Sequence, residues 1–198
     1  MTAEPAKVAH QWPMPPQDGY TVDDLFTLPE LPPHTELIDG SLVFVSPQRR
    51  FHAKMINLLL NGLERTVPAE MTIEREITVV LDRRNGPEPD ISVARSSGIV
   101  DMDQTHFLAA DILLAIEVIS PESEARDRSA KPAKYAAAGI PNFWLVERAG
   151  VDKHPVVHVY ELDRLTKAYA LTGIHHDRLK TSVPFTIDID ISRGALGR

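Results

Sequence analysis

The chain has 198 residues, of which 43% are hydrophobic and 25% are charged, a composition that suits one globular domain with a full core and leaves little room for two. It contains no cysteine, which excludes disulfides, thiolate metal sites and cysteine nucleophiles, and no apolar run approaches the roughly 18–20 residues of a membrane span. Its 28 acidic residues outnumber the 21 basic ones, for a net charge of −7. This charge disfavours a protein that coats nucleic acid by charge alone, but it is compatible with an enzyme that gathers carboxylates around a cation.

The first residues form a distinct segment. They are rich in proline and show no hydrophobic period, so residues 1–19 are predicted to be a proline-rich arm in front of a single domain over residues 20–198. This segment also lacks the apolar centre of a secretory signal, and we therefore expect a cytoplasmic protein that does not contact a membrane.

Periodicity, helix caps and turn signals predict the remaining elements. Thr21 is suited to cap a helix, and Asp39-Gly40 is the strongest hairpin signal in the chain. In chain order, we expect a helix over 22–28, a hairpin over 37–45, a helix over 51–66, strands over 71–81, 91–94 and 112–119, a helix over 127–138, a strand over 143–146, a hairpin of 156–161 with 167–171, and a last strand over 185–191. This order predicts an α/β or α+β fold in which helices flank a mixed β-sheet, with an N-terminal and a C-terminal β-hairpin.

Glu117 is the first residue that suggests chemistry. It interrupts the apolar run ILLAIEVI over residues 112–119, whose length and composition are typical of a central strand buried on both faces. A carboxylate there must be paired, protonated or bound to a metal, because an isolated buried charge costs several kcal/mol or more. An ion pair with an arginine, or a strand end that reaches water, is the alternative explanation.

Asp90 is the second such residue. It follows the stretch GPEP, so the chain is extended as it enters the next predicted strand. A carboxylate at the start of one strand and Glu117 near the end of a neighbouring strand can converge on one hard cation. Mg²⁺ favours this pairing, because one or two carboxylates suffice when waters and substrate phosphate complete its shell. A turn or cap aspartate is the alternative.

Lys131 and Tyr135 lie one helical turn apart on the helix that follows Glu117. Lysine supplies a compact cation for a scissile phosphate or an attacking water, and tyrosine can hold either the phosphate or the lysine. Without the upstream carboxylates, a solvated helix would be the preferred interpretation.

Four segments occur in order over about two thirds of the chain: ELIDGSLVFVSP (residues 36–47), the helix that contains His52, PEPDISV (87–93) and AIEVISPESEARDRSAKPAKYAAAGIPNFWLVE (115–147). Together they resemble the Uma2 family, formerly a domain of unknown function, which is assigned to the PD-(D/E)xK restriction-endonuclease-like superfamily. The last segment is long and carries most of the specificity.

The resemblance implies a metal-dependent endonuclease that uses Mg²⁺ or Mn²⁺ to hydrolyse phosphodiester bonds of nucleic acid, with DNA as the favoured substrate. It makes Asp90 the motif aspartate and Glu117 the (D/E) residue, both as metal ligands, and Glu36 a further acid beside the metal. Ile119 stands where the superfamily has its lysine. Lys131 is the natural substitute, as in the Uma2 pattern itself, and is expected to position or deprotonate the attacking water.

Further residues are candidates for a supporting role. His52, near a helix start, is suited to phosphate contact or base catalysis, and a surface histidine is an equal alternative. Ser120 and Asp127 are expected to brace the turn between strand and helix, and Tyr135 completes this supporting set. Basic residues near the site are expected to guide the nucleic-acid backbone: Arg49, Arg50, Lys54, Arg126 and Arg128.

Other conspicuous residues are given structural roles. Trp144 is expected in the core. Adjacent histidines point apart on a strand and do not easily share one ion, so we expect surface positions for His154, His158, His175 and His176.

Two other function classes stay open. The first is a nuclease-like fold that binds nucleic acid or a protein partner without cutting, which Ile119 favours. The second is a structural protein whose buried acids pair with Arg126 or Lys131. In the nuclease interpretation, a homodimer is expected, with the proline-rich arm and the C-terminal third available for assembly.

Overall fold

The computed structural model describes residues 14–44 and 48–197. Its helices, including the 3-10 and π segments, are α1 (Val22–Thr27), α2 (Arg50–Glu64), η1 (Ser96–Gly98), η2 (Ala109–Asp111), η3 (Arg126–Ala130) and α3 (Lys131–Ala137). Its strands are β1 (Thr35–Ile38), β2 (Ser41–Phe44), β3 (Met71–Arg75), β4 (Thr78–Val80), β5 (Ile91–Arg95), β6 (His106–Leu108), β7 (Ile112–Val118), β8 (Asn142–Ala149), β9 (His154–Asp163), β10 (Ala168–His175), β11 (Arg178–Thr181) and β12 (Ile187–Asp190).

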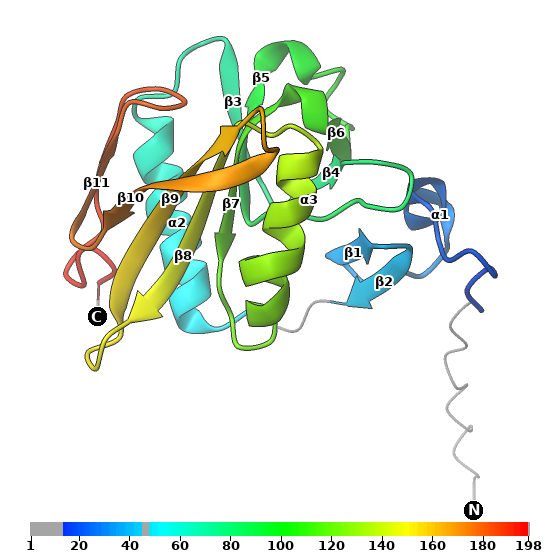
Figure 1. Cartoon of the computed structure of the whole chain (residues 1–198), viewed down its shortest axis with the longest axis horizontal. Helices are drawn as coiled ribbons and strands as arrows, with labels where there is room; N and C mark the ends of the chain where they lie inside the picture. Colours follow the sequence, from blue (N-terminus) through cyan, green and yellow to red (C-terminus); the bar gives the residue numbers. More distant parts are fainter. Residues whose placement is uncertain (1–13, 45–47, 198) are drawn as a thin grey trace, which may run out of the picture.

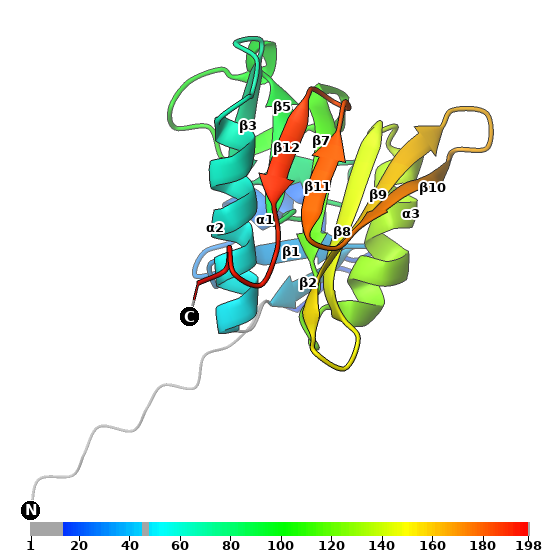
Figure 2. The same cartoon turned by 90° about the vertical axis from the view of Figure 1, so that its left-hand side faces the viewer.

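A six-stranded mixed sheet in the order β10-β9-β8-β7-β5-β3 forms the centre of the fold. Strands β7 and β8 are parallel, and the other neighbours in this sheet are antiparallel. Helix α3 covers the face seen in Figure 1 and α2 lies behind the sheet; Figure 2 shows the strands between these two helices. The predicted mixed sheet flanked by helices is therefore confirmed. No helix in the described part of the chain is long and apolar enough to cross a membrane.

Strand β7 separates two hydrophobic clusters because its side chains alternate between the two faces of the sheet. Leu114, Ile116 and Val118 belong to the cluster that packs against α2 and the β11–β12 ribbon. Ala115 belongs to the cluster that packs against α3. Every residue of β7 is buried, as predicted for a central strand. Glu117, two positions after Ala115, therefore faces α3.

Local signals predict two N-terminal features correctly. Thr21 caps α1 in a reciprocal capping box with Asp24, which satisfies backbone donors that the first helical turn leaves free. Asp39 and Gly40 both have positive φ values, 51° and 75°, as a two-residue hairpin turn requires. Of the predicted arm, residues 1–13 lie outside the described residues, and Gly19 closes a short turn onto Pro16.

The sheet edge departs from the sequence prediction. The single strand expected over residues 71–81 is wrong, because Glu76 adopts a left-handed conformation with φ 50° and separates β3 from β4. Strand β4 instead pairs in parallel with β6 in a separate ribbon. Strands β6 and β11 were not predicted, since each is short and β11 has only one fully buried residue.

The helix predicted over residues 127–138 is also irregular. Its first part is the π segment η3, in which Lys131 N donates to the Arg126 carbonyl five residues earlier. Pro132 explains this irregularity, because it has no N–H and its ring would clash with the carbonyl of Arg128 in a regular α-helix. The wider turn then passes into α3 at Lys131.

Candidate active site

Two neighbouring strands bring Asp90 beside Glu117. In the antiparallel pair of β5 and β7, Ile91 lies opposite Ile116, so the residues just outside this pair are also neighbours. Asp90 Oδ2 accepts a hydrogen bond of 2.6 Å from Val118 N. Asp90 and Glu117 therefore lie side by side on neighbouring strands, and both line the same cavity.

Lys131 links three buried carboxylates. Its Nζ lies 2.7 Å from Glu36 Oε1 and 3.1 Å from Glu117 Oε2. It also lies 3.6 Å from Asp127 Oδ1. Burial by itself would lower the pKa of Lys131, but these carboxylates outweigh it and hold the pKa well above its usual range. The side chain is therefore an ammonium in the site.

Glu117 is fixed from two sides. Tyr135, fully buried on α3, donates a 2.6 Å hydrogen bond to Glu117 Oε1, and Lys131 occupies the other oxygen. Burial raises the pKa of Glu117 well above its usual range, because the charge of Lys131 only partly offsets the loss of solvent and the nearby carboxylates add to the shift. An added cation would favour its charged form.

His52 supports Asp90 from α2. The side chain is buried, and its Nε2 lies 3.1 Å from Asp90 Oδ1. Burial lowers the pKa of His52, but the hydrogen bond and the charge of Asp90 outweigh it and give a net upward shift. The alternative of a surface histidine is wrong.

The turn between β7 and η3 is held by short-range hydrogen bonds. Ser120 Oγ and Ser123 Oγ lie 3.0 Å apart, and Ser123 donates to the carboxylate of Asp127. Burial raises the pKa of Asp127 despite the opposing effects of Lys131 and Ser123. Ser123 was not predicted from the sequence, although its spacing of three residues from Ser120 around a proline was a turn signal.

Apart from Tyr135, which is buried behind Glu117, these side chains line one cavity of about 550 Å³. Its remaining lining includes acids that sequence reasoning missed, namely Glu76, Glu88 and Glu122. Glu88 pairs with His34, and its backbone N donates to Glu36 Oε1 at 2.9 Å. No periodicity marks these loop residues, so only the folded chain shows that they face the site.

The predicted basic residues are divided by the fold. Arg49 and Arg126 line the cavity. Arg128 instead pairs with Glu124 and Glu147. Lys54 donates to the Leu196 carbonyl at 2.7 Å, beside a different groove.

The histidines expected at the surface do not line the cavity. His176 is exposed, whereas three others are partly exposed: His154, His158 and His175. Trp144 is fully buried, as predicted.

The donor set fits a hard divalent cation. Four carboxylates line the cavity, those of Glu36, Asp90, Glu117 and Asp127. Lys131 pairs with all of them except Asp90, so the four acids exceed the one ammonium among them. Among the described residues, no hydrogen-bond donor reaches the buried Asp127 Oδ1. Within residues 14–44 and 48–197, no group of three or more acidic or histidine side chains is placed to hold a metal ion by itself. Such a cation would therefore complete its shell with waters and substrate oxygens, as Mg²⁺ commonly does.

Comparisons with known proteins agree with this fold. The model of a family described as "Uma2: Putative restriction endonuclease" matches residues 22–192. A solved structure, described as "a putative nuclease belonging to DUF820 from Anabaena variabilis", superposes with a TM-score of 0.62 at 21% identity and covers 83% of this chain and 89% of its own. No curated protein matches the chain. The structural similarity establishes a shared fold.

Proposed function

Since the chain belongs to the Uma2 family of nuclease-like proteins, we propose that it is a metal-dependent endonuclease that hydrolyses phosphodiester bonds of DNA. The observation that carries this proposal is the convergence of Asp90 and Glu117 with the Lys131 ammonium in one open cavity. Carboxylates next to a cationic side chain are suited to hold both a divalent ion and the phosphate on which it acts.

In this proposal, Asp90 and Glu117 hold Mg²⁺ or Mn²⁺. The bound ion supplies Lewis acidity toward the scissile phosphate. Val118 N and His52 orient the Asp90 carboxylate, while Tyr135 orients that of Glu117. Such supporting contacts keep ligand oxygens in place before the ion arrives.

Lys131 and Glu36 complete the proposed catalytic set. The ammonium of Lys131, held between Glu36 and Glu117, offsets the negative charge that develops on the phosphate. During hydrolysis, the attacking water gives up a proton to solvent as its oxygen bonds to phosphorus. The bond to the leaving sugar oxygen breaks, and that oxygen takes up a proton from solvent. Glu36 keeps Lys131 close to the phosphate and orients the water.

Plasmid DNA incubated with Mg²⁺ or Mn²⁺ tests the activity. Wild type should convert supercoiled plasmid to nicked or linear forms, whereas Asp90→Asn and Glu117→Gln should lose this activity almost completely. Asp188→Asn is a matched control, because Asp188 pairs with Arg178 outside the cavity, and it should cut like wild type. Cleavage that persists in both variants would contradict the assignment of Asp90 and Glu117 as the metal ligands.

A second candidate is a nuclease-fold protein that binds nucleic acid or a protein partner without cutting. The sequence has Ile119 in place of the motif lysine, and the substitute Lys131 is already engaged by three carboxylates. Titration with Mg²⁺ by calorimetry separates the two functions: cation binding that disappears in Asp90→Asn supports the nuclease, and no binding by wild type supports the second candidate.

We also propose a homodimer. Two sites related by a two-fold axis would suit the cleavage of both strands of a duplex. Sedimentation equilibrium at micromolar concentration tests this assembly, and a monomer that still linearises plasmid in one step would contradict it.

A further inference from the structure

Arg126 differs from the other arginines of the cavity. Arg49 pairs with Glu122 at 2.6 Å, and Arg75 contacts Glu76 at 3.0 Å. Arg126 also lines the cavity, but among the described residues no carboxylate pairs with it, and its Nε is buried without an acceptor. A buried donor without a partner is unfavourable, because it has given up its hydrogen bonds to water. This guanidinium is therefore available for an anion that enters the cavity.

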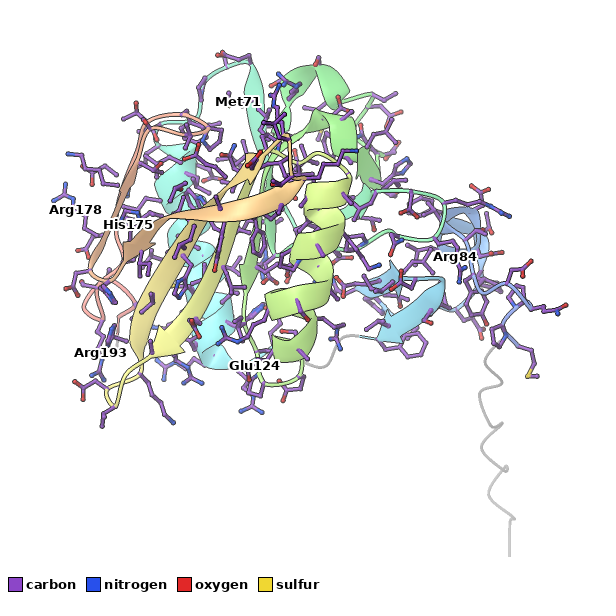
Figure 3. The ribbon with its side chains drawn as sticks, in the orientation of Figure 1. Met71, Arg84, Glu124, His175, Arg178 and Arg193 are labelled. Carbon is purple, nitrogen blue, oxygen red and sulfur yellow. The ribbon has the colours of Figure 1, made fainter. Side chains whose placement is uncertain are left out.

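The π turn explains why Arg126 faces the same cavity as Lys131. Residues five apart in an α-helix are separated by about 140° around the axis. In η3, the hydrogen bond from Lys131 N to the Arg126 carbonyl joins residues five apart. Arg126 and Lys131 therefore lie one above the other, in successive turns on the same side of the helix. Figure 3 labels Glu124, at the end of the helix where this turn begins.

The surroundings of Arg126 also restrict the kind of anion. The cavity is already rich in carboxylates, and those of Glu36, Glu117 and Asp127 are engaged by Lys131. A guanidinium presents a planar set of donors that matches a phosphate with two hydrogen bonds. Arg126 lines the cavity, so its planar donor set is suited to two oxygens of one phosphate group.

We propose that Arg126 binds a backbone phosphate of the nucleic-acid substrate, next to the phosphate that lies at Asp90 and Glu117. This inference rests on the proposed nuclease function and adds a substrate-binding residue to it. Arg126 fixes the position of the strand in the cavity, whereas Lys131 acts at the scissile phosphate.

Binding measurements test the inference separately from cleavage. The anisotropy of a fluorescein-labelled 20-base-pair DNA duplex (a length of about two helical turns) is measured in EDTA and in Ca²⁺, over a series of salt concentrations. Arg126→Gln should weaken binding about tenfold or more and reduce the slope of log K against log salt by about one. Arg126→Lys should keep the salt slope but recover only part of the affinity, because it keeps the charge and loses the planar donor set.

Arg178→Gln is the matched control. Arg178 is paired with Asp188 on the β11–β12 ribbon and does not line the cavity. It should bind DNA like wild type. If wild type binds and cuts DNA while Arg126→Gln keeps the wild-type affinity and salt slope, the inference is overturned and the nuclease function stands. If wild type neither binds nor cuts DNA, both are overturned.

Discussion

Lys131 supplies the positive charge that allows three acids to be buried together. Glu36, Glu117 and Asp127 are almost inaccessible to solvent. Each has an oxygen that lies no more than 3.6 Å from the Lys131 ammonium. Removing one partner of a buried ion pair commonly costs about 3–5 kcal/mol. Truncation of Lys131 would therefore reduce both the stability of the fold and the rate of cleavage. A substitution of the neighbouring Tyr135 separates these two effects better.

Tyr135→Phe is that separating substitution. It removes the hydroxyl that donates to Glu117 and keeps the buried ring in the core. The free energy of unfolding in urea should fall by about 1–2 kcal/mol, because a buried acceptor loses its donor. The rate of DNA cleavage should fall about tenfold or more, because the Glu117 carboxylate is less well oriented.

Tyr169→Phe provides the control for this prediction. The Tyr169 hydroxyl donates to the Ile140 carbonyl at 2.8 Å and does not line the cavity. Its removal should cost similar stability and leave cleavage unchanged. If the two variants cut DNA equally well, Tyr135 does not position Glu117.

At the scale of elements, η3 decides which side chains of the helical segment reach the cavity. Pro132 prevents a regular α-helical hydrogen bond to the Arg128 carbonyl, and the π turn accommodates this loss. Pro132→Ala restores the donor, so the segment should convert to regular α-helix and turn Arg126 away from the cavity. DNA affinity in Ca²⁺ should then fall about tenfold, while the free energy of unfolding stays the same or rises.

A crystal structure of Pro132→Ala checks the conversion directly. Pro68→Ala, in the loop between α2 and β3, controls for general effects of losing a proline. Unchanged DNA affinity in a variant whose helix has become regular would show that the π turn is irrelevant to binding.

The helical segment is also attached to the sheet by Glu147 of β8. Burial raises the pKa of Glu147, but hydrogen bonds from Arg128 and His158 outweigh it, so the pKa lies below its usual value. Because this pKa is lower in the folded state than in the unfolded state, the charged carboxylate stabilises the fold at any pH above its unfolded-state pKa. This stabilisation is lost as the pH falls through the folded-state pKa.

Glu147→Gln should therefore reduce the free energy of unfolding by about 1 kcal/mol or less at pH 7, since the partners are partly screened by solvent. The difference from wild type should shrink as the pH falls through the lowered pKa of Glu147, as measured by urea denaturation at a series of acidic pH values. Glu161→Gln, an exposed substitution on β9, should show no such dependence. A constant difference at all pH values would exclude the charge as its origin.

For the whole molecule, the cavity adds a local excess of carboxylates to a chain whose net charge is already −7. A cation that binds only the folded state stabilises it by about 2.7 kcal/mol when its concentration is one hundred times Kd. Mg²⁺ or Mn²⁺ should therefore raise the unfolding temperature of wild type. Glu117→Gln should remove this increase and, without metal, keep a stability close to that of wild type, because it also removes one of the mutually repelling acids.

Calorimetric unfolding with and without metal measures both effects. Glu161→Gln should retain the full metal-induced increase. If Glu117→Gln is strongly destabilised without metal, and wild type gains nothing from Mg²⁺, the buried acids serve as structural ion pairs instead of a metal site.

Local signals were sufficient for much of the fold. The apolar run around Glu117 predicted β7, because a strand buried on both faces excludes polar residues, and Asp39-Gly40 predicted the hairpin of β1 and β2, because both positions require positive φ values. The break at Glu76 could not be predicted in this way. It depends on the pairing of β4 with β6, a contact between segments more than two dozen residues apart.

The sequence by itself predicted the acids of the proposed site, Asp90 and Glu117, because a charge inside an apolar strand and an aspartate after prolines are local anomalies. Only the tertiary structure decided how these acids are neutralised, which buried side chain supports each of them, and that Arg126 faces the same cavity with no carboxylate partner among the described residues. The reason is physical: distances and protonation depend on the register of β5 against β7 and on the π turn before α3, and neither is encoded in the periodicity of a single segment.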